Sequence, residues 1–145
     1  FQLVEKHGKN LYEIIKEKAD DDRKVFYIFG GVEADEREAI RGIVEKEKDA
    51  IIVASYGTFS TGVNIKNLHN IVFASPSKSR IRNLQSIGRG LRLGDNKVNA
   101  TLYDIADDLT HKSKENFTLK HFQERINIYT EEEFDYEMHN IDLKE

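Results

Sequence analysis

Residues 81–92 carry arginines and a glutamine at helical spacing, and these side chains could bind phosphate. If the stretch is a helix, Gln85, Arg89 and Arg92 share one face with Arg82, while isoleucines and leucines occupy the other. Guanidinium groups stay charged and donate forked hydrogen bonds that match phosphate oxygens. Two glycines among the arginines favour the close approach of a ligand or a neighbouring domain. The alternative is an ordinary surface helix with a solvated basic face.

The rest of a nucleotide site is absent from the sequence. The one Gly-Lys pair, Gly8-Lys9, does not fit the phosphate-binding pattern G-x-x-x-x-G-K-[ST]. The acidic run at 35–38 opens a predicted helix and does not end a strand, so we expect it to stabilise that helix. The chain has instead what a second domain, facing the nucleotide site, would supply: an arginine that reaches the transferring phosphoryl group. Arg89 is the first candidate for this catalytic role and Arg92 the second.

Composition and charge set broad limits. The 145 residues are enough for one domain with its own core, and no cysteine is present for disulfides or thiolate metal sites. Net charge is −4, but residues 104–145 hold 12 acids against 5 bases, so a basic site precedes an acidic tail. No apolar run is long enough to span a bilayer. We expect no membrane partner, a cytoplasmic location, and a chain that is one part of a longer protein.

Apolar strands alternate with amphipathic helices along the first part of the chain. We expect helices at 7–19 and 34–46, and strands at 25–29, 50–54, 69–74 and 98–105, with residues 1–4 ending a further strand. A hydroxyl-rich loop is expected at 55–64, directly after a strand. This order predicts an α/β fold with a parallel β-sheet sandwiched by helices. Its ligand crevice would lie at the carboxyl ends of the strands.

The pattern changes towards the C-terminus. We expect a helix at 113–129 and an edge strand at 134–138, where apolar and acidic residues alternate. The sequence therefore predicts a main domain over 1–108 and a C-terminal helical and strand extension, 109–145, packed on it.

Several motifs resemble those of superfamily 2 helicases, in the same order along the chain. Gln85-x-x-Gly88-Arg89-x-x-Arg92 is similar to motif VI, and residues 60–64, Ser-Thr-Gly-Val-Asn, are similar to motif V. Gly30 followed by Arg37 resembles the segment after the second strand of these enzymes, and residues 1–11 resemble motif IV. The resemblance implies that residues 1–108 form the second, C-terminal RecA-like helicase domain.

The resemblance also implies roles for individual residues. Arg89 would be the arginine finger and Arg92 its companion at the γ-phosphate, with Gln85, Gly62 and Asn64 also at the nucleotide. Families with aspartate at the position of Asn64 use it near the ribose. The nucleic-acid backbone would be contacted by Gly30, Gly31, Arg37, Ser55, Thr58, Ser60 and Thr61. Hydroxyls, amides and an arginine can bind phosphates without reading the base sequence.

The function implied is the C-terminal motor domain of an ATP-dependent DNA helicase or translocase that unwinds or remodels branched DNA in recombination and repair. ATP and Mg²⁺ would be bound mainly by the first RecA-like domain, so this chain alone, without Walker A and B motifs, would be inactive. DNA, branched or duplex, would be held by its backbone. Alternatives are the motor part of a restriction or excision-repair complex, and a nucleic-acid-binding module without a motor.

Overall fold

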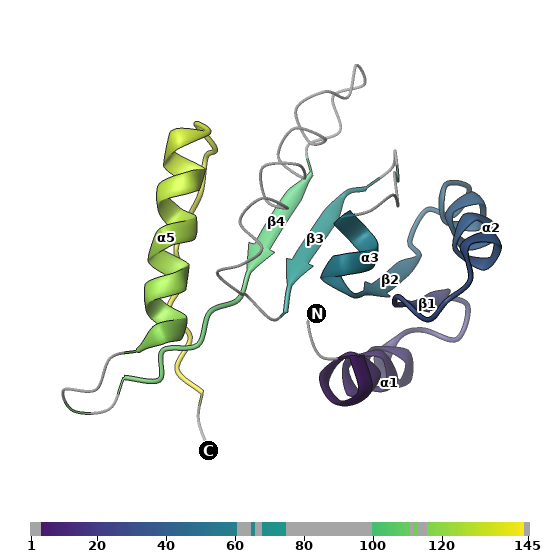
Figure 1. The fold of residues 1–145 in the computed structure, drawn as a ribbon, viewed down its shortest axis with the longest axis horizontal. Helices are drawn as coiled ribbons and strands as arrows, with labels where there is room; N and C mark the ends of the chain where they lie inside the picture. The colour runs from purple at the N-terminus through teal and green to yellow at the C-terminus, as the bar shows by residue number, and fades with distance from the viewer. Residues whose placement is uncertain are drawn as a thin grey trace. The chain divides into compact units, whose positions relative to one another are not determined.

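The computed structural model describes residues 4–60, 65, 68–74, 100–110, 112 and 116–143, with only the backbone of Val4, Phe59 and Ser60. The chain divides into two compact units, Phe1–Ile105 and Ala106–Glu145 (Figure 1). The division into domains at residue 108 stays a prediction. Of the expected strand at the N-terminus only Val4 is described, and it begins a π-helical turn, Val4–Gly8.

The first strand pair consists of β1 (Val25–Ile28) and β2 (Ile51–Ala54), which run parallel. Both strands are rich in β-branched and aromatic residues, which favour strands. Val25 pairs with Ile51 and Ile28 with Ala54. Ile28 is fully buried and Val53 is 4% exposed, so this pair contributes a large part of the core. The strands expected at 25–29 and 50–54 are confirmed, each one residue shorter.

Helices α1 (Lys9–Lys18) and α2 (Ala34–Val44) confirm the two helices expected in the first half of the chain. Helix α1 packs on β1, where the rings of Tyr12 and Tyr27 stack with centroids 5.3 Å apart. Asp35 and Glu36 lie in the first turn of α2, where carboxylates favour the positive end of the helix dipole. The acidic run at 35–38 is therefore part of a helix, as expected.

The second strand pair consists of β3 (Asn70–Phe73) and β4 (Thr101–Asp104), which are also parallel. Ile71 and Phe73 are buried, whereas Val72 and its register partner Tyr103 are more than half exposed. One face of this pair thus joins the core. The strands expected at 69–74 and 98–105 are confirmed with narrower bounds, and the α/β class with parallel pairing is confirmed with them.

The segment after β2 differs from the expected loop. Residues Tyr56–Ser60 form a short helix, α3, directly after Ser55. Tyr56 is buried, and its ring lies 5.6 Å from that of Phe73 in β3. The small and hydroxyl-bearing residues suggested a turn, but burial of Tyr56 against the second strand pair stabilises a helical turn here. The remainder of the expected loop, residues 61–64, lies outside the described residues.

The second unit is built on α5 (Phe117–Glu131), which confirms the C-terminal helix with shifted bounds. Asn116 caps it: its side-chain oxygen accepts a hydrogen bond from the amide of Leu119 at 3.2 Å. At the other end Glu133 adopts φ 57°, and the amide of Phe134 donates to the carbonyl of Tyr129 at 2.9 Å. This is a Schellman arrangement, which reverses the chain direction after a helix.

The edge strand expected at 134–138 is wrong. These residues are extended but belong to no strand in the described part of the chain. The rings of Phe134 and Tyr136 each lie 6.4 Å from that of Tyr129, so the segment runs back along α5 (Figure 1). The alternating apolar residues pack on a helix, which satisfies the same period of two without a partner strand.

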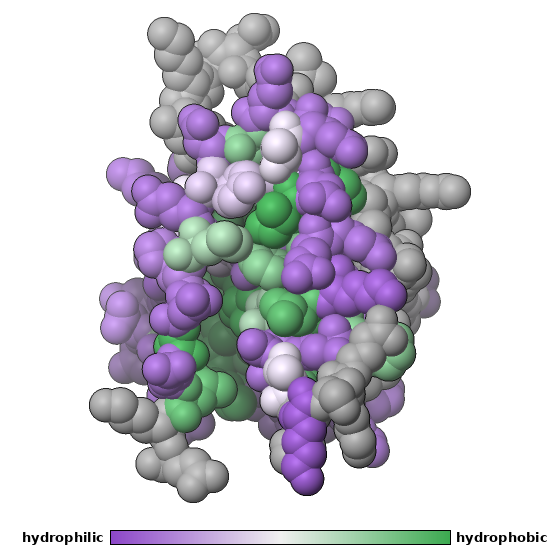
Figure 2. All heavy atoms as spheres, turned by 90° about the vertical axis from the view of Figure 1, so that its left-hand side faces the viewer, coloured by the Kyte–Doolittle hydropathy of each residue, from purple (hydrophilic) through white to green (hydrophobic). Residues whose placement is uncertain are grey.

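The second unit also carries exposed apolar side chains. Met138 is 67% exposed and Ile141 80%. Figure 2 looks onto the side of α5 and shows apolar surface, in green, between hydrophilic side chains in purple. No helix among the described residues is both long and apolar enough to cross a membrane.

Candidate nucleic-acid interface

The structure describes five of the predicted site residues with their side chains: Gly30, Gly31, Arg37, Ser55 and Thr58. Ser60 is described by its backbone alone, as the last residue of α3. The remaining predicted site residues lie outside the described part of the chain, and their roles stay predictions: Thr61, Gly62, Asn64, Gln85, Arg89 and Arg92.

Gly30 and Gly31 form the centre of a tight turn between β1 and α2. The carbonyl of Phe29 accepts a hydrogen bond from the amide of Val32 at 3.0 Å, which closes the turn. Both glycines are exposed. No hydrogen bond among the described residues uses their amides, so two successive N–H donors remain available to an outside acceptor.

Arg37 lies one turn into α2 and is half-buried. Its Nε atom is buried and has no hydrogen-bond partner within the described ranges. A buried donor on a charged group is costly to leave unpaired. An anion bound to the guanidinium of this half-buried side chain would balance its charge, and phosphate suits a guanidinium.

Carboxylates surround the start of α2. Glu33, Asp35 and Glu36 are all exposed there. They already compensate the helix dipole and would repel a phosphate placed at the helix terminus. The groups suited to a phosphate are therefore the amides of the glycine turn and the guanidinium of Arg37, and not the helix end.

Ser55 and Thr58 lie at the carboxyl end of β2. The amide of Ser55 donates to the carbonyl of Ile28 at 3.0 Å, so Ser55 sits beside the end of β1, from which the glycine turn begins. The two hydroxyl oxygens are 2.9 Å apart, and both residues are buried. The structure thus brings the predicted residues of two loops to one edge of the strand pair. The hydroxyl pair itself faces inward.

Sequence reasoning missed the aromatic residues beneath the glycine turn. The ring of Phe29 lies 5.1 Å from that of Tyr27, which stacks on Tyr12 of α1. Burial raises the pKa of Tyr27, with a smaller contribution from the charge of Glu5. The alternation of Tyr27 and Phe29 on one face of a strand could have indicated that both point towards the same helix.

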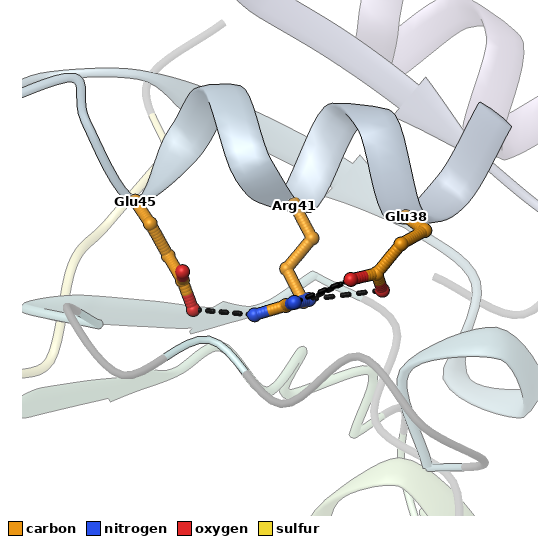
Figure 3. Close-up of polar contacts among 3 residues, drawn as sticks. All are labelled: Glu38, Arg41 and Glu45. Carbon is orange, nitrogen blue, oxygen red and sulfur yellow. Dashed lines mark hydrogen bonds and ion pairs between the residues drawn. The ribbon is translucent and has the colours of Figure 1, made fainter. Parts of the chain in front are cut away.

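A second arginine on α2 has a different environment. Arg41 lies between Glu38 and Glu45, as Figure 3 shows, with ion pairs to both and 2.7 Å from its Nη1 to the nearer oxygen of Glu45. The hydrogen bond from Arg41 holds the pKa of Glu38 below its usual range, and the two carboxylates raise the pKa of Arg41. Arg41 is thus neutralised by its neighbours on α2, whereas Arg37 has no such ion pair with the residues that the structure describes.

Two parallel strand pairs, a helix that connects the first pair, and an arginine on that helix without a carboxylate partner among the described residues define an α/β domain able to hold a phosphate-rich ligand. The chain belongs to the helicase conserved C-terminal domain family, whose model matches residues 3–94. It is 41% identical over 147 residues to the ATP-dependent DNA helicase UvsW of Enterobacteria phage T4, covering 94% of this chain and 29% of the phage protein.

Two further comparisons agree with this family. The crystal structure of T4 UvsW matches with a TM-score of 0.72 and 41% identity, over 95% of this chain and 29% of that one. IRC3 of Saccharomyces cerevisiae, whose name describes an ATP-dependent helicase, is 28% identical over 107 residues, or 72% of this chain and 15% of that protein. The chain thus spans less than a third of either relative. The resemblance indicated by the motifs, including that of residues 53–109 to the phage helicase, is confirmed, as is the RecA-like fold.

Proposed function

We propose that this chain is the C-terminal motor domain of an ATP-dependent DNA helicase or translocase that unwinds or remodels branched DNA in recombination and repair. The observation that carries the proposal is the 41% identity to the phage DNA helicase over nearly the whole chain. The half-buried Arg37, on the helix that follows the glycine turn, supports it, because its Nε has no hydrogen-bond partner in the described part of the chain.

ATP binds between this domain and a first RecA-like domain in the proposed motor. Arg89 acts as the arginine finger and Arg92 assists it at the γ-phosphate, with Gln85, Gly62 and Asn64 also at the nucleotide. An arginine finger contributes roughly 10³ to 10⁵ in rate in known phosphoryl-transfer enzymes.

In this proposal Mg²⁺ is bound mainly by the first RecA-like domain. Among the described residues no group of three or more histidines, aspartates or glutamates could hold a metal ion. The sequence also lacks a phosphate-binding loop of the Walker A form. In this proposal the chain alone, without Walker A and B motifs, does not hydrolyse ATP.

DNA is bound through its backbone in this proposal, with the glycine turn and Arg37 as the contact formed by β1 and α2. Ser55, Thr58, Ser60 and Thr61 extend the contact at the end of β2. The paired, inward hydroxyls of Ser55 and Thr58 fix the start of α3, so that backbone donors nearby can reach a phosphate. Binding that relies on phosphates depends on salt and varies little with base sequence.

The location proposed for the protein is the cytoplasm, which for a phage protein means the infected host. Two other functions fit the same family: the motor part of a restriction or excision-repair complex, and a nucleic-acid-binding module without a motor. The first differs in having a nuclease or damage-recognition part elsewhere in the protein. The second predicts tight DNA binding by this chain alone.

The test is DNA-stimulated ATP hydrolysis by the complete motor, comprising this chain and the first RecA-like domain, with Arg89→Ala beside the wild type. Hydrolysis should fall by about a hundredfold or more, while ATP and DNA still bind. Arg41→Ala is the matched control, because that arginine is neutralised by Glu38 and Glu45. If hydrolysis by Arg89→Ala persists and only DNA affinity falls, Arg89 is a phosphate contact and the proposed mechanism is wrong.

A further inference from the structure

The ring of Phe29 occupies the space that a side chain on Gly31 would need. A Cβ atom at Gly31 would lie 2.7 Å from one ring carbon of Phe29 and 3.3 Å from another. Real Cβ contacts essentially never fall below 3.0 Å, so the ring or the turn would have to move. A Cβ atom at Gly30 would meet nothing within 4 Å. A side chain at position 31 would thus displace the ring of Phe29 or the turn, whereas one at position 30 meets no residue other than its chain neighbours.

The ring of Phe29 is itself held in place. Tyr27 lies against it with centroids 5.1 Å apart, and Tyr27 in turn stacks on Tyr12 at 5.3 Å. All three rings are half-buried. The backbone of Phe29 also closes the turn, through the hydrogen bond from Val32 to its carbonyl. Phe29 thus fixes the turn twice, by its carbonyl and by its ring.

We infer that Phe29 is a positioning residue for nucleic-acid binding: it holds the Gly30–Gly31 turn so that the two exposed amides face a backbone phosphate. The inference rests on the proposed function, because it takes the ligand to be the nucleic-acid backbone. A turn that is ordered before binding loses little conformational entropy when the phosphate arrives. Phe29 acts through Gly31 and needs no contact with the phosphate.

The test measures two constants of DNA-stimulated ATP hydrolysis in the complete motor: the KM for DNA and kcat at saturating DNA. Gly31→Ala should raise the KM for DNA about tenfold, because the amides no longer point at the phosphate, and leave kcat within about twofold. Phe29→Leu should raise the KM several-fold, and Phe29→Tyr, which keeps the ring, should not. In the double variant, which combines Gly31→Ala with Phe29→Leu, the ring that would clash with the new Cβ atom is gone. Adding Gly31→Ala to Phe29→Leu should therefore raise the KM for DNA by less than about twofold further.

Gly42→Ala is the matched control. It makes the same chemical change in the last turn of α2, where a Cβ atom meets nothing within 4 Å. Both constants should stay at the wild-type values. A merely structural defect would lower kcat at saturating DNA, whereas a positioning defect is confined to the KM for DNA. If Phe29→Leu does not fold, Phe29→Met replaces it, because an unbranched chain can bend away from Gly31.

Three outcomes would overturn the inference. If Gly31→Ala and Phe29→Leu leave the KM for DNA unchanged while Arg37→Ala raises it, Phe29 has no positioning role, although the proposed contact stands. If the two effects simply multiply in the double variant, Phe29 does not act through Gly31. If Arg37→Ala also leaves the KM unchanged, the proposed contact at this turn is wrong and the inference fails with it.

Discussion

Arg37 and Arg41 lie one helical turn apart on α2, yet among the described residues carboxylates pair with Arg41 and not with Arg37. The buried Nε of Arg37 has no hydrogen-bond partner in the ranges that the structure describes. The same side chain on the same helix is thus a structural ion pair in one position and, in the proposed function, a phosphate contact in the other.

Arg37→Gln should therefore change how DNA binding depends on salt. Removal of one phosphate contact lowers the slope of log affinity against log salt by about one, without regard to base sequence. Arg41→Gln should leave the slope at the wild-type value. DNA affinity of the complete motor, measured between about 50 and 200 mM salt, gives both slopes. Equal slopes for Arg37→Gln and wild type would exclude a phosphate contact.

Arg41→Met should lower the melting temperature slightly, and the loss should depend on pH. The hydrogen bond from Arg41 lowers the pKa of Glu38 below its ordinary value of 4.5. A lowered folded-state pKa stabilises the fold above pH 4.5 and ceases to do so as pH falls through the folded value. The difference between Arg41→Met and wild type should therefore shrink on acidification below pH 4.5, and also in high salt. A difference that stays constant down to pH 3 would show that packing, and not charge, is responsible.

Ile28→Ala should destabilise the first unit by about 2–5 kcal/mol, because Ile28 is fully buried and its removal leaves a cavity. Ile14→Ala is the control, since Ile14 is half exposed on α1 and should change stability by less than about 0.5 kcal/mol. Urea denaturation of both variants measures the difference. Similar losses would mean that the core does not centre on β1.

Asn116→Ala should reduce the stability of α5 by about 1 kcal/mol through loss of its cap. Asn116→Ser should be nearly neutral. Asn116→Asp should be worse than serine, although aspartate caps helices well, because the side-chain nitrogen of Asn116 donates to Asp108 at 2.8 Å. Hydrogen bonds from Thr110 and Asn116 hold the pKa of Asp108 below its usual range, and a second carboxylate would reverse this effect. Hydrogen exchange at the Leu119 amide reports the result, and equal protection in the serine and aspartate variants would contradict it.

Glu133→Gly should stabilise the second unit by about 1 kcal/mol. Glu133 has φ 57° at the end of α5, a conformation that disfavours side chains with a Cβ atom. Glu132→Gly is the control. Glu132 has φ −85°, so its replacement by glycine should bring no gain. Hydrogen exchange of the last turn of α5 measures the stability of both variants. Increased protection in Glu132→Gly as well as in Glu133→Gly would contradict the assignment of strain to Glu133.

The sequence predicts most of the fold because local signals and packing agree there. Both strands of each pair are short apolar runs, and α2 has acids in its first turn and Arg41 in its last. Prediction failed where tertiary contacts decided the outcome. Tyr56 packs on Phe73 and makes a helix of an expected loop, and Phe134 and Tyr136 pack on Tyr129 where a strand was expected.

The candidate site shows the same limit. Gly30, Gly31 and Arg37 could be found from residue types and family motifs. The role proposed for Phe29 depends on how close its ring lies to the place of a Cβ atom at Gly31, a distance that no spacing in the sequence encodes. The neutralisation of Arg41 by Glu38 and Glu45 follows the i, i+3 and i, i+4 rule and could have been predicted.

Parallel pairing in both strand pairs also affects how the chain folds during synthesis. Val25 pairs with Ile51 and Asn70 with Thr101, so neither pair can form as a local hairpin. Such non-local contacts slow folding. As the chain leaves the ribosome, β3 must wait for the whole connection to β4 before its backbone finds this partner. In that interval the apolar residues Ile71, Val72 and Phe73 lack this strand partner, and an unpaired apolar strand is a site where nascent chains can aggregate.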